Sequence, residues 1–259
     1  MNPLRRRLSS FLGLFAALLL SGPALADLAD TIARIKPSLV VVGTFNKLKS
    51  PSFAMRGSGF VVGDGRLVAT NAHVIPEATG NAPGQDSLMI LARQGTETRP
   101  YPAQLVTRDT EHDLALLRIT GPALPALTLG ASDTVREGHS VAFSGFPIGG
   151  ALGFSPVTHR GIISSITPIA IPIGNANQLK DQSIRRLRSG VFPIFQLDGT
   201  AYPGNSGGPL FDPDSGEVLG IINMVFIKST KESVLEKPSG ISYAIPTKHL
   251  AELLSNIRQ

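Results

Sequence analysis

The sequence predicts an all-β fold, and three observations support that prediction. The chain has 27 glycines and 20 prolines among 259 residues, a balance typical of many turns and few long helices. Short β-branched segments recur along it, most of them bounded by Gly, Pro, Asp or Asn. No long helical pattern separates these segments, which argues against a parallel sheet with crossover helices. Many short strands at this spacing are typical of sandwiches or barrels.

The elements follow in order along the chain. A short helix is expected first, because Leu28, Ile32 and Ile35 share one face before Pro37 ends the pattern. The predicted strands are 39–44, 59–62, 66–70, 87–91, 114–119, 140–143, 158–164, 218–222 and 241–244. A last helix is expected to begin near Thr247, with its leucines forming one apolar stripe and His249 pointing to solvent.

Residues 1–26 have the pattern of a secretory signal peptide. Three arginines at 5–7 precede an apolar run at 11–20, and Ala24-Leu25-Ala26 is a small-x-small cleavage signature. The run is too short to span a bilayer comfortably, which disfavours an uncleaved anchor. We expect an exported protein that starts at Asp27, in a bacterial periplasm or outside the cell, with no stable membrane anchor. General secretory and twin-arginine export both stay open.

Charge and cysteine content exclude several classes of function. The net charge is +5, and removal of the three leader arginines leaves +2, which gives little support to a nucleic-acid partner. The absence of cysteine excludes disulfides, a cysteine nucleophile and thiolate metal sites. No His-Glu-x-x-His motif or ligand cluster occurs, so we expect neither a metal nor an organic cofactor.

The chain divides into two halves at a connector rich in proline. Residues 121–125 read Gly-Pro-Ala-Leu-Pro, and we place the boundary so that 27–125 and 126–259 each form one small barrel. An irregular stretch at 167–191 is either functional or a solvated surface excursion.

A glycine-rich turn around Ser206 offers a nucleophile. In Gly204-Asn205-Ser206-Gly207-Gly208-Pro209, glycines on both sides permit a backbone that exposes the hydroxyl of Ser206. The backbone N–H groups of Gly204 and Ser206 are the candidate oxyanion hole. Serine and glycine are common in turns, so this turn alone is weak evidence of catalysis.

His73 and Asp113 are the candidate base and its partner. A serine hydroxyl needs an adjacent base, and His73 follows a predicted strand that runs into a turn. Asp113 leads into an apolar strand, where an unpaired charge is costly; Asp109 and Glu111 are rivals for this role. His, then Asp, then Ser is the chain order of chymotrypsin, and differs from the orders of subtilisin and the α/β-hydrolases.

Four motifs together resemble the HtrA/Deg family of trypsin-like serine proteases. They are 57–62 (GSGFVV), 70–74 (TNAHV), 112–117 (HDLALL) and 204–210 (GNSGGPL), and the resemblance runs from about residue 30 to 250. It implies two six-stranded antiparallel β-barrels with the triad between them, ATP-independent cleavage of protein or peptide substrates, and a homotrimer. Because the chain stops at Gln259, we expect it to lack the PDZ domain common in the family.

The resemblance also implies a specificity pocket. Thr200 would lie at its base, with Asn223, Val225 and Gly240 along its walls. No acid stands at the base position, so cleavage after small or medium apolar residues is expected, although nearby Asp198 counts against this. The family comparison further implies no zymogen switch, since uncharged Asn205 precedes the nucleophile.

Two other functions stay open. One is a non-catalytic binding or chaperone-like module that keeps the protease fold. The other is an esterase with the same triad, because the acyl chemistry is shared.

Overall fold

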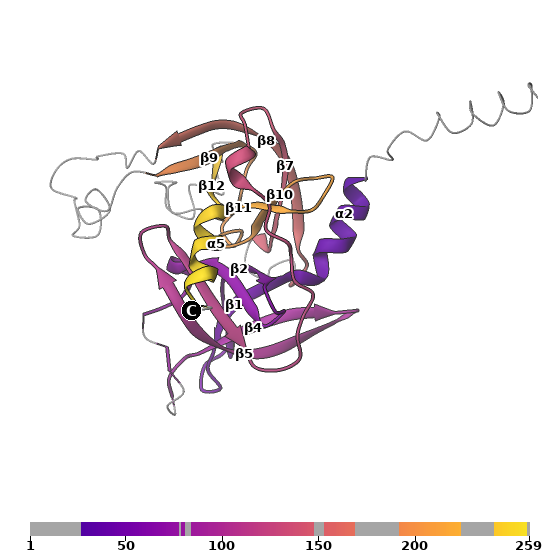
Figure 1. Cartoon of the computed structure of the whole chain (residues 1–259). Helices are drawn as coiled ribbons and strands as arrows, with labels where there is room; N and C mark the ends of the chain where they lie inside the picture. The colour runs from indigo at the N-terminus through magenta and orange to yellow at the C-terminus, as the bar shows by residue number, and fades with distance from the viewer. Residues whose placement is uncertain are drawn as a thin grey trace, which may run out of the picture.

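The protein folds into two closed antiparallel β-barrels of six strands each (Figure 1), which confirms the all-β prediction. The structure, a computed structural model, describes residues 27–77, 79–80, 84–147, 153–168, 192–223 and 241–257. The proposed signal peptide, most of the 167–191 stretch, Val225 and Gly240 lie outside the described residues. None of the described helices has the length and apolar character needed to cross a lipid bilayer.

The first barrel contains the strands β1 to β6. In chain order they are β1 (Leu39–Phe45), β2 (Phe53–Val62), β3 (Leu67–Asn71), β4 (Ser87–Gln94), β5 (Glu97–Asp109) and β6 (Leu114–Ile119). Their order in the sheet is β1-β2-β3-β6-β5-β4, and β4 closes the barrel by pairing with β1. The 3-10 turn η2 (Ala72–Val74) follows β3 directly and carries His73.

The second barrel contains β7 to β12, and a short helix lies at each end of the described chain. The strands are β7 (Ser140–Gly145), β8 (Val157–Pro168), β9 (Pro193–Asp198), β10 (Pro209–Phe211), β11 (Val218–Asn223) and β12 (Ile241–Pro246), in the sheet order β10-β11-β12-β9-β8-β7. The helices are α2 (Leu28–Ile35) and α5 (Thr247–Asn256). Residues 120–139 join the barrels, and the domain boundary placed at 125/126 stays a prediction.

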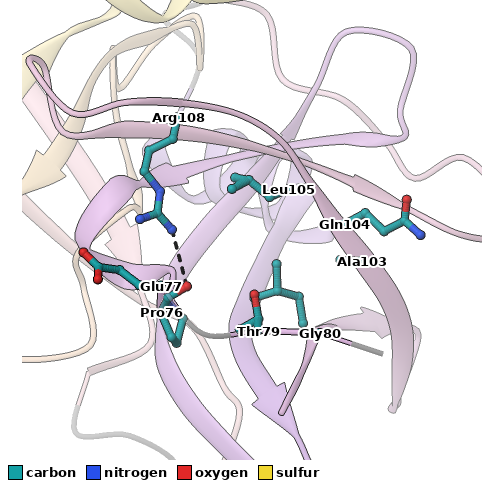
Figure 2. Close-up of a pocket in the computed structure, with 9 residues that line it drawn as sticks. Pro76, Glu77, Thr79, Gly80, Ala103, Gln104, Leu105 and Arg108 are labelled. Carbon is teal, nitrogen blue, oxygen red and sulfur yellow. Dashed lines mark hydrogen bonds between the residues drawn. The ribbon is translucent and has the colours of Figure 1, made fainter. Parts of the chain in front are cut away.

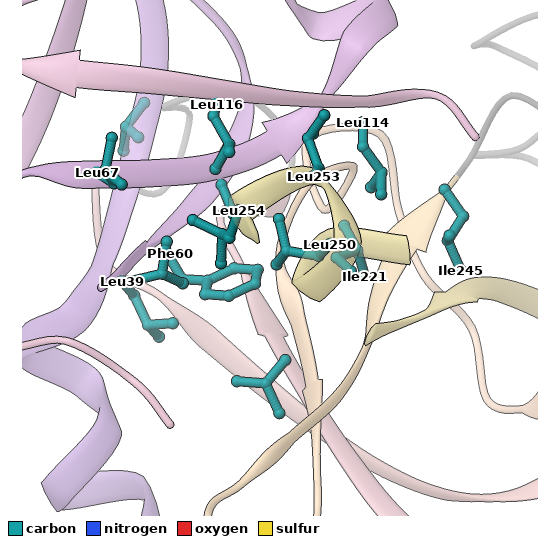
Figure 3. Packing of buried hydrophobic residues seen from close by; sticks show 14 of the residues in the cluster. Leu39, Phe60, Leu67, Leu114, Leu116, Ile221, Ile245, Leu250, Leu253 and Leu254 are labelled. Atoms are coloured by element: carbon teal, nitrogen blue, oxygen red, sulfur yellow. The ribbon is translucent and has the colours of Figure 1, made fainter. Parts of the chain in front are cut away.

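Both faces of the central strands are buried, and each face belongs to a different core. In β1, Val40 and Val42 point into the first barrel, whereas Leu39 and Val41 join a cluster shared with the second barrel. Successive side chains of a strand alternate between its faces, so a strand covered on both sides reads as a continuous apolar run. The shared cluster also includes Leu250, Leu253 and Leu254 of α5 (Figure 3), which pack against apolar residues of both barrels.

His249 on α5 differs from the sequence-based expectation. We expected it to point to solvent, but it is only 8% exposed. Its ring stacks on His112 of the first barrel with the centroids 3.9 Å apart, and Phe192 meets it edge-on. Because the leucine stripe of α5 is drawn into the shared core, the side of the helix next to that stripe is buried as well.

Candidate active site

The turn that carries Ser206 lies between β9 and β10 and is held by short backbone hydrogen bonds. The Asn205 N–H donates to Tyr202 O, and the Gly208 N–H donates to Asn205 O, both at 2.9 Å. Within the described part of the chain, the N–H groups of Gly204 and Ser206 have no acceptor. Two neighbouring backbone donors are therefore free to bind an anionic oxygen.

Gly207 shows why this turn needs glycine. Its φ is 87°, a left-handed conformation that side chains disfavour. A Cβ at this position would also clash with the Ser58 carbonyl oxygen and the Thr70 hydroxyl of the first barrel. The turn is thus packed tightly against the strands β2 and β3.

His73 and Asp113 are joined directly. The imidazole Nδ1 lies 2.7 Å from Asp113 Oδ2, and the His73 backbone N–H donates to Asp113 Oδ1 at 2.9 Å. The aspartate side chain is 5% exposed, whereas the imidazole is 30% exposed. The buried carboxylate therefore holds a ring whose other edge can reach solvent or a substrate.

A third donor to this carboxylate was not foreseen from the sequence. The amide Nδ2 of Asn223, on β11 of the second barrel, donates to Asp113 Oδ2 at 2.6 Å. Asp113 itself has φ 54°, and its carbonyl oxygen accepts from the Ala72 N–H at 3.0 Å. The two nitrogens of His73 and the amide of Asn223 satisfy a carboxylate that would otherwise be costly to bury.

The two rivals for the acid role lie elsewhere. Asp109 binds the neighbouring imidazole of His112, with Oδ2 and Nδ1 2.7 Å apart. Hydrogen bonds from the backbone and ring of His112 lower the pKa of Asp109 despite the opposing effect of burial. Glu111 is exposed.

The two parts of the site come from different barrels and meet along β3. The Gly207 position lies 3.2 Å from the Asn71 nitrogen, measured from an ideal Cβ, and Asn71 is two residues before His73. The hydroxyl of Ser206 makes no hydrogen bond with any described residue, His73 included. The serine turn and the His73–Asp113 pair are therefore adjacent but not hydrogen-bonded to each other.

The residues predicted for the specificity pocket are only partly described. Thr200 is half-buried, in a segment pinned to β12 because Ser242 Oγ donates to Gly199 O and accepts from the Ala201 N–H, both at 2.7 Å. Asn223 is fully buried with its amide on Asp113, and its place in the pocket wall stays a prediction. Asp198 is exposed on β9.

A separate pocket of about 550 Å³ is lined by residues that closely follow His73, including Pro76 and Glu77, and by residues of β5 (Figure 2). Arg108 on β5 reaches across it, and its Nη2 donates to Ile75 O at 3.0 Å and to Pro76 O at 3.4 Å. None of the lining residues belongs to the Ser206 turn. Arg108 thus holds the segment after His73 against β5.

The described ranges hold no group of three or more His, Asp or Glu side chains that could bind a metal ion.

Paired six-stranded barrels, with a serine turn on one and a histidine–aspartate pair on the other, are the architecture of chymotrypsin-like proteins. A family model described as a trypsin-like peptidase domain matches residues 57–221. The chain therefore belongs to the family of trypsin-like peptidase domains.

Within that family the similarity is to HtrA and DegP-type proteins, as the sequence motifs predicted. A probable periplasmic serine endoprotease DegP-like from Halomonas elongata is 34% identical over 203 residues, 78% of this chain and 35% of that protein. Human serine protease HTRA3 is 31% identical over 237 residues, 89% of this chain and 45% of that protein. The chain thus spans less than half the length of these curated relatives.

Solved structures give the same result. The HtrA-type protease AlgW with tripeptide superposes with a TM-score of 0.64 at 30% identity, covering 89% of this chain and 63% of that one. A serine-to-alanine variant of AlgW with tripeptide gives a TM-score of 0.63 over 90% of this chain and 64% of that one, also at 30% identity.

Proposed function

We propose that this chain is a serine endopeptidase in which His73, Asp113 and Ser206 form the catalytic triad. The observation that carries the proposal is the 2.7 Å contact between His73 Nδ1 and Asp113 Oδ2. A carboxylate at Nδ1 selects the tautomer in which that nitrogen carries the proton. Nε2, at the opposite edge of the ring, is then unprotonated and ready to act as a base.

The proposed chemistry proceeds through an acyl-enzyme. His73 Nε2 takes the Ser206 proton as the serine oxygen attacks the peptide carbonyl, and Asp113 stabilises the imidazolium that forms. The free N–H groups of Gly204 and Ser206 hold the negative oxygen of the tetrahedral intermediate. His73 next protonates the leaving amine, and water releases the acyl group by the reverse steps.

A hydrogen bond between Ser206 and His73 is needed only when substrate is bound. Catalytic hydrogen bonds are often long in unliganded enzymes and tighten when substrate binds. The tight packing of the Ser206 turn against β3, two residues before His73, supports the proposal that the hydroxyl and the ring act together.

The substrates, specificity and location are proposed from the family. We expect protein or peptide substrates cut after small or medium apolar residues, with Thr200 at the base of the pocket and Asn223, Val225 and Gly240 around it. Exposed Asp198 lies on β9 outside this set. The leader pattern at 1–26 and the periplasmic relatives favour export. A homotrimer is the oligomer implied by the family.

The test compares the chain starting at Asp27 with its Ser206→Ala variant in fluorophosphonate labelling and casein cleavage. Ser206→Ala is expected to abolish labelling and to lower turnover by about four to six orders of magnitude. Ser255→Ala, which changes an exposed serine on α5, is the matched control and should remain fully active.

Each rival function predicts a different result in the same assay. A binding or chaperone-like module takes no label. An esterase is labelled and cleaves a simple ester but leaves casein intact. A peptide-library profile dominated by Lys and Arg would reject the proposed specificity, and activity that appears only after a second N-terminal cut would reject the absence of a zymogen switch.

A further inference from the structure

Ser58 on β2 is a polar side chain buried where the two barrels meet. It is fully buried, yet its hydroxyl is satisfied twice: Oγ donates to Gly204 O at 2.6 Å and accepts from the Phe146 N–H at 2.9 Å. Its backbone N–H donates to Ser206 O at 2.8 Å. All three partners belong to the second barrel, so one residue of the first barrel binds both ends of the Gly204–Ser206 segment.

The Ser58 hydroxyl fixes one particular peptide group. In the peptide between Gly204 and Asn205, the carbonyl oxygen is held by Ser58 Oγ and the N–H by Tyr202 O. Glycine lacks the Cβ that limits rotation, and Gly204 has φ 106°. The orientation of this peptide therefore depends on its two hydrogen bonds more than on steric restriction.

The neighbouring peptides of the turn are held by backbone groups alone. Asn205 O accepts from the Gly208 N–H, and Ser206 O accepts from the Ser58 N–H. Across the ranges that the structure describes, Ser58 supplies the only side chain that hydrogen-bonds the backbone of residues 202–208. Removing its hydroxyl thus loosens the turn at Gly204 and leaves the later peptides pinned.

We propose that Ser58 is a positioning residue for the oxyanion site. The peptide between Gly204 and Asn205, which Ser58 holds, lies between the peptide that carries the Gly204 N–H and the peptide that carries the Ser206 N–H, so it sets the orientation of these two donors relative to each other. It contacts no substrate and acts only through the turn. The assignment rests on the proposed function, in which these two N–H groups stabilise the tetrahedral intermediate.

The test is Ser58→Ala, with Thr31→Val as the matched control. Thr31 is also fully buried, and its hydroxyl donates to a backbone carbonyl, Asp214 O, at 3.1 Å. It lies on α2 and contacts none of the site residues named above. Each change removes one hydroxyl-to-carbonyl bond and one bond that the hydroxyl accepts, from the Phe146 N–H at Ser58 and from Arg34 Nη2 at Thr31, so both should lower the free energy of unfolding by about 1 to 3 kcal/mol.

Catalysis separates the two variants. Complete loss of an oxyanion donor lowers kcat by about 10²- to 10³-fold, and a displaced donor retains part of its effect, so Ser58→Ala should lower kcat about 10- to 100-fold. Its KM should stay within about threefold, because the interaction is made only in the transition state. The inhibition constant of a peptide boronate, whose serine adduct is tetrahedral, should rise in proportion to the loss of kcat. Thr31→Val should change none of these quantities.

The outcomes distinguish the proposed function from the role of Ser58. An active wild type with an inactive Ser206→Ala supports the function, and unchanged kcat and boronate inhibition in folded Ser58→Ala then overturns the role of Ser58 alone. A wild type that is neither labelled by fluorophosphonate nor active on casein overturns both. If Ser58→Ala does not fold, Ser58→Cys keeps the side-chain shape with a weaker donor, and the same fall in kcat is expected.

Discussion

Replacing His249 by phenylalanine tests the consequence of burying an imidazole between the two barrels. Both ring nitrogens of His249 are buried and make no hydrogen bond with the described residues, and the ring stacks on His112. Desolvation, followed by the electrostatic effect of the neighbouring His112 ring, lowers the pKa of His249 from 6.5 to about 4. Of the other charged groups nearby, Lys248 lowers this pKa, while Glu252 and Asp109 oppose the shift.

The direction of the pH dependence follows from this pKa. Between about pH 4 and pH 6.5 the unfolded chain binds a proton at His249 that the folded chain does not, so stability falls as the pH falls. The stabilisation is intact above the unfolded pKa of 6.5 and is lost progressively toward the folded pKa. From about pH 7.5 to about pH 4.5, this single group lowers the free energy of unfolding by about 2 to 3 kcal/mol.

The measurement is urea unfolding of wild type and His249→Phe at both pH values. Phenylalanine keeps an aromatic ring against His112 and Phe192 and removes the titrating nitrogens. Relative to wild type, the variant should gain about 2 to 3 kcal/mol in unfolding free energy on acidification, whatever its stability at neutral pH. Unfolding free energies that fall in parallel in the two proteins would refute the argument, because His249 would then make no net contribution to the acid response.

Two further substitutions test the site, each against a matched control. Gly207→Ala should lower the free energy of unfolding by more than about 2 kcal/mol and abolish casein cleavage. Gly138→Ala, at φ 85° with no atom near the added methyl group, should lower the free energy of unfolding by only about 1 kcal/mol. Equal shifts of the melting temperature in the two variants would contradict the tight packing of the turn. Asn223→Ala should lower kcat about 10-fold, because Asp113 loses a 2.6 Å hydrogen bond that orients its carboxylate. Asn46→Ala, which removes a similar amide-to-carboxylate bond at Asp86, should leave kcat unchanged, and equal kcat in both variants would argue against that orienting role.

Most of the strands that the sequence predicted contain an apolar run that can be recognised locally, although 158–164 does not, and β9 was also missed. The segments 39–44 and 114–119 lie in β1 and β6, where nearly every side chain is buried. β5 was missed because most of its side chains are exposed and because Pro100 and Pro102 lie within it, residues that argue against a central strand. β10 was missed because it has only three residues.

The chemistry of the candidate site was also visible in the sequence, but its support was not. His73, Asp113 and Ser206 stand in short motifs whose residue types and chain order already suggest acyl transfer. Nothing local marks Asn223 as a donor to Asp113, 110 residues away, or Ser58 as the residue that holds Gly204, 146 residues away.

The amino-acid sequence by itself therefore determined most of the strands, the two-barrel family and the candidate reactive side chains. Only the tertiary structure decided that His249 is buried, that Asn223 binds Asp113 and that Ser58 joins the barrels at the serine turn. The physical reason is that periodicity reports which face of an element is apolar. Which distant group meets that face depends on how two separately closed barrels pack against each other.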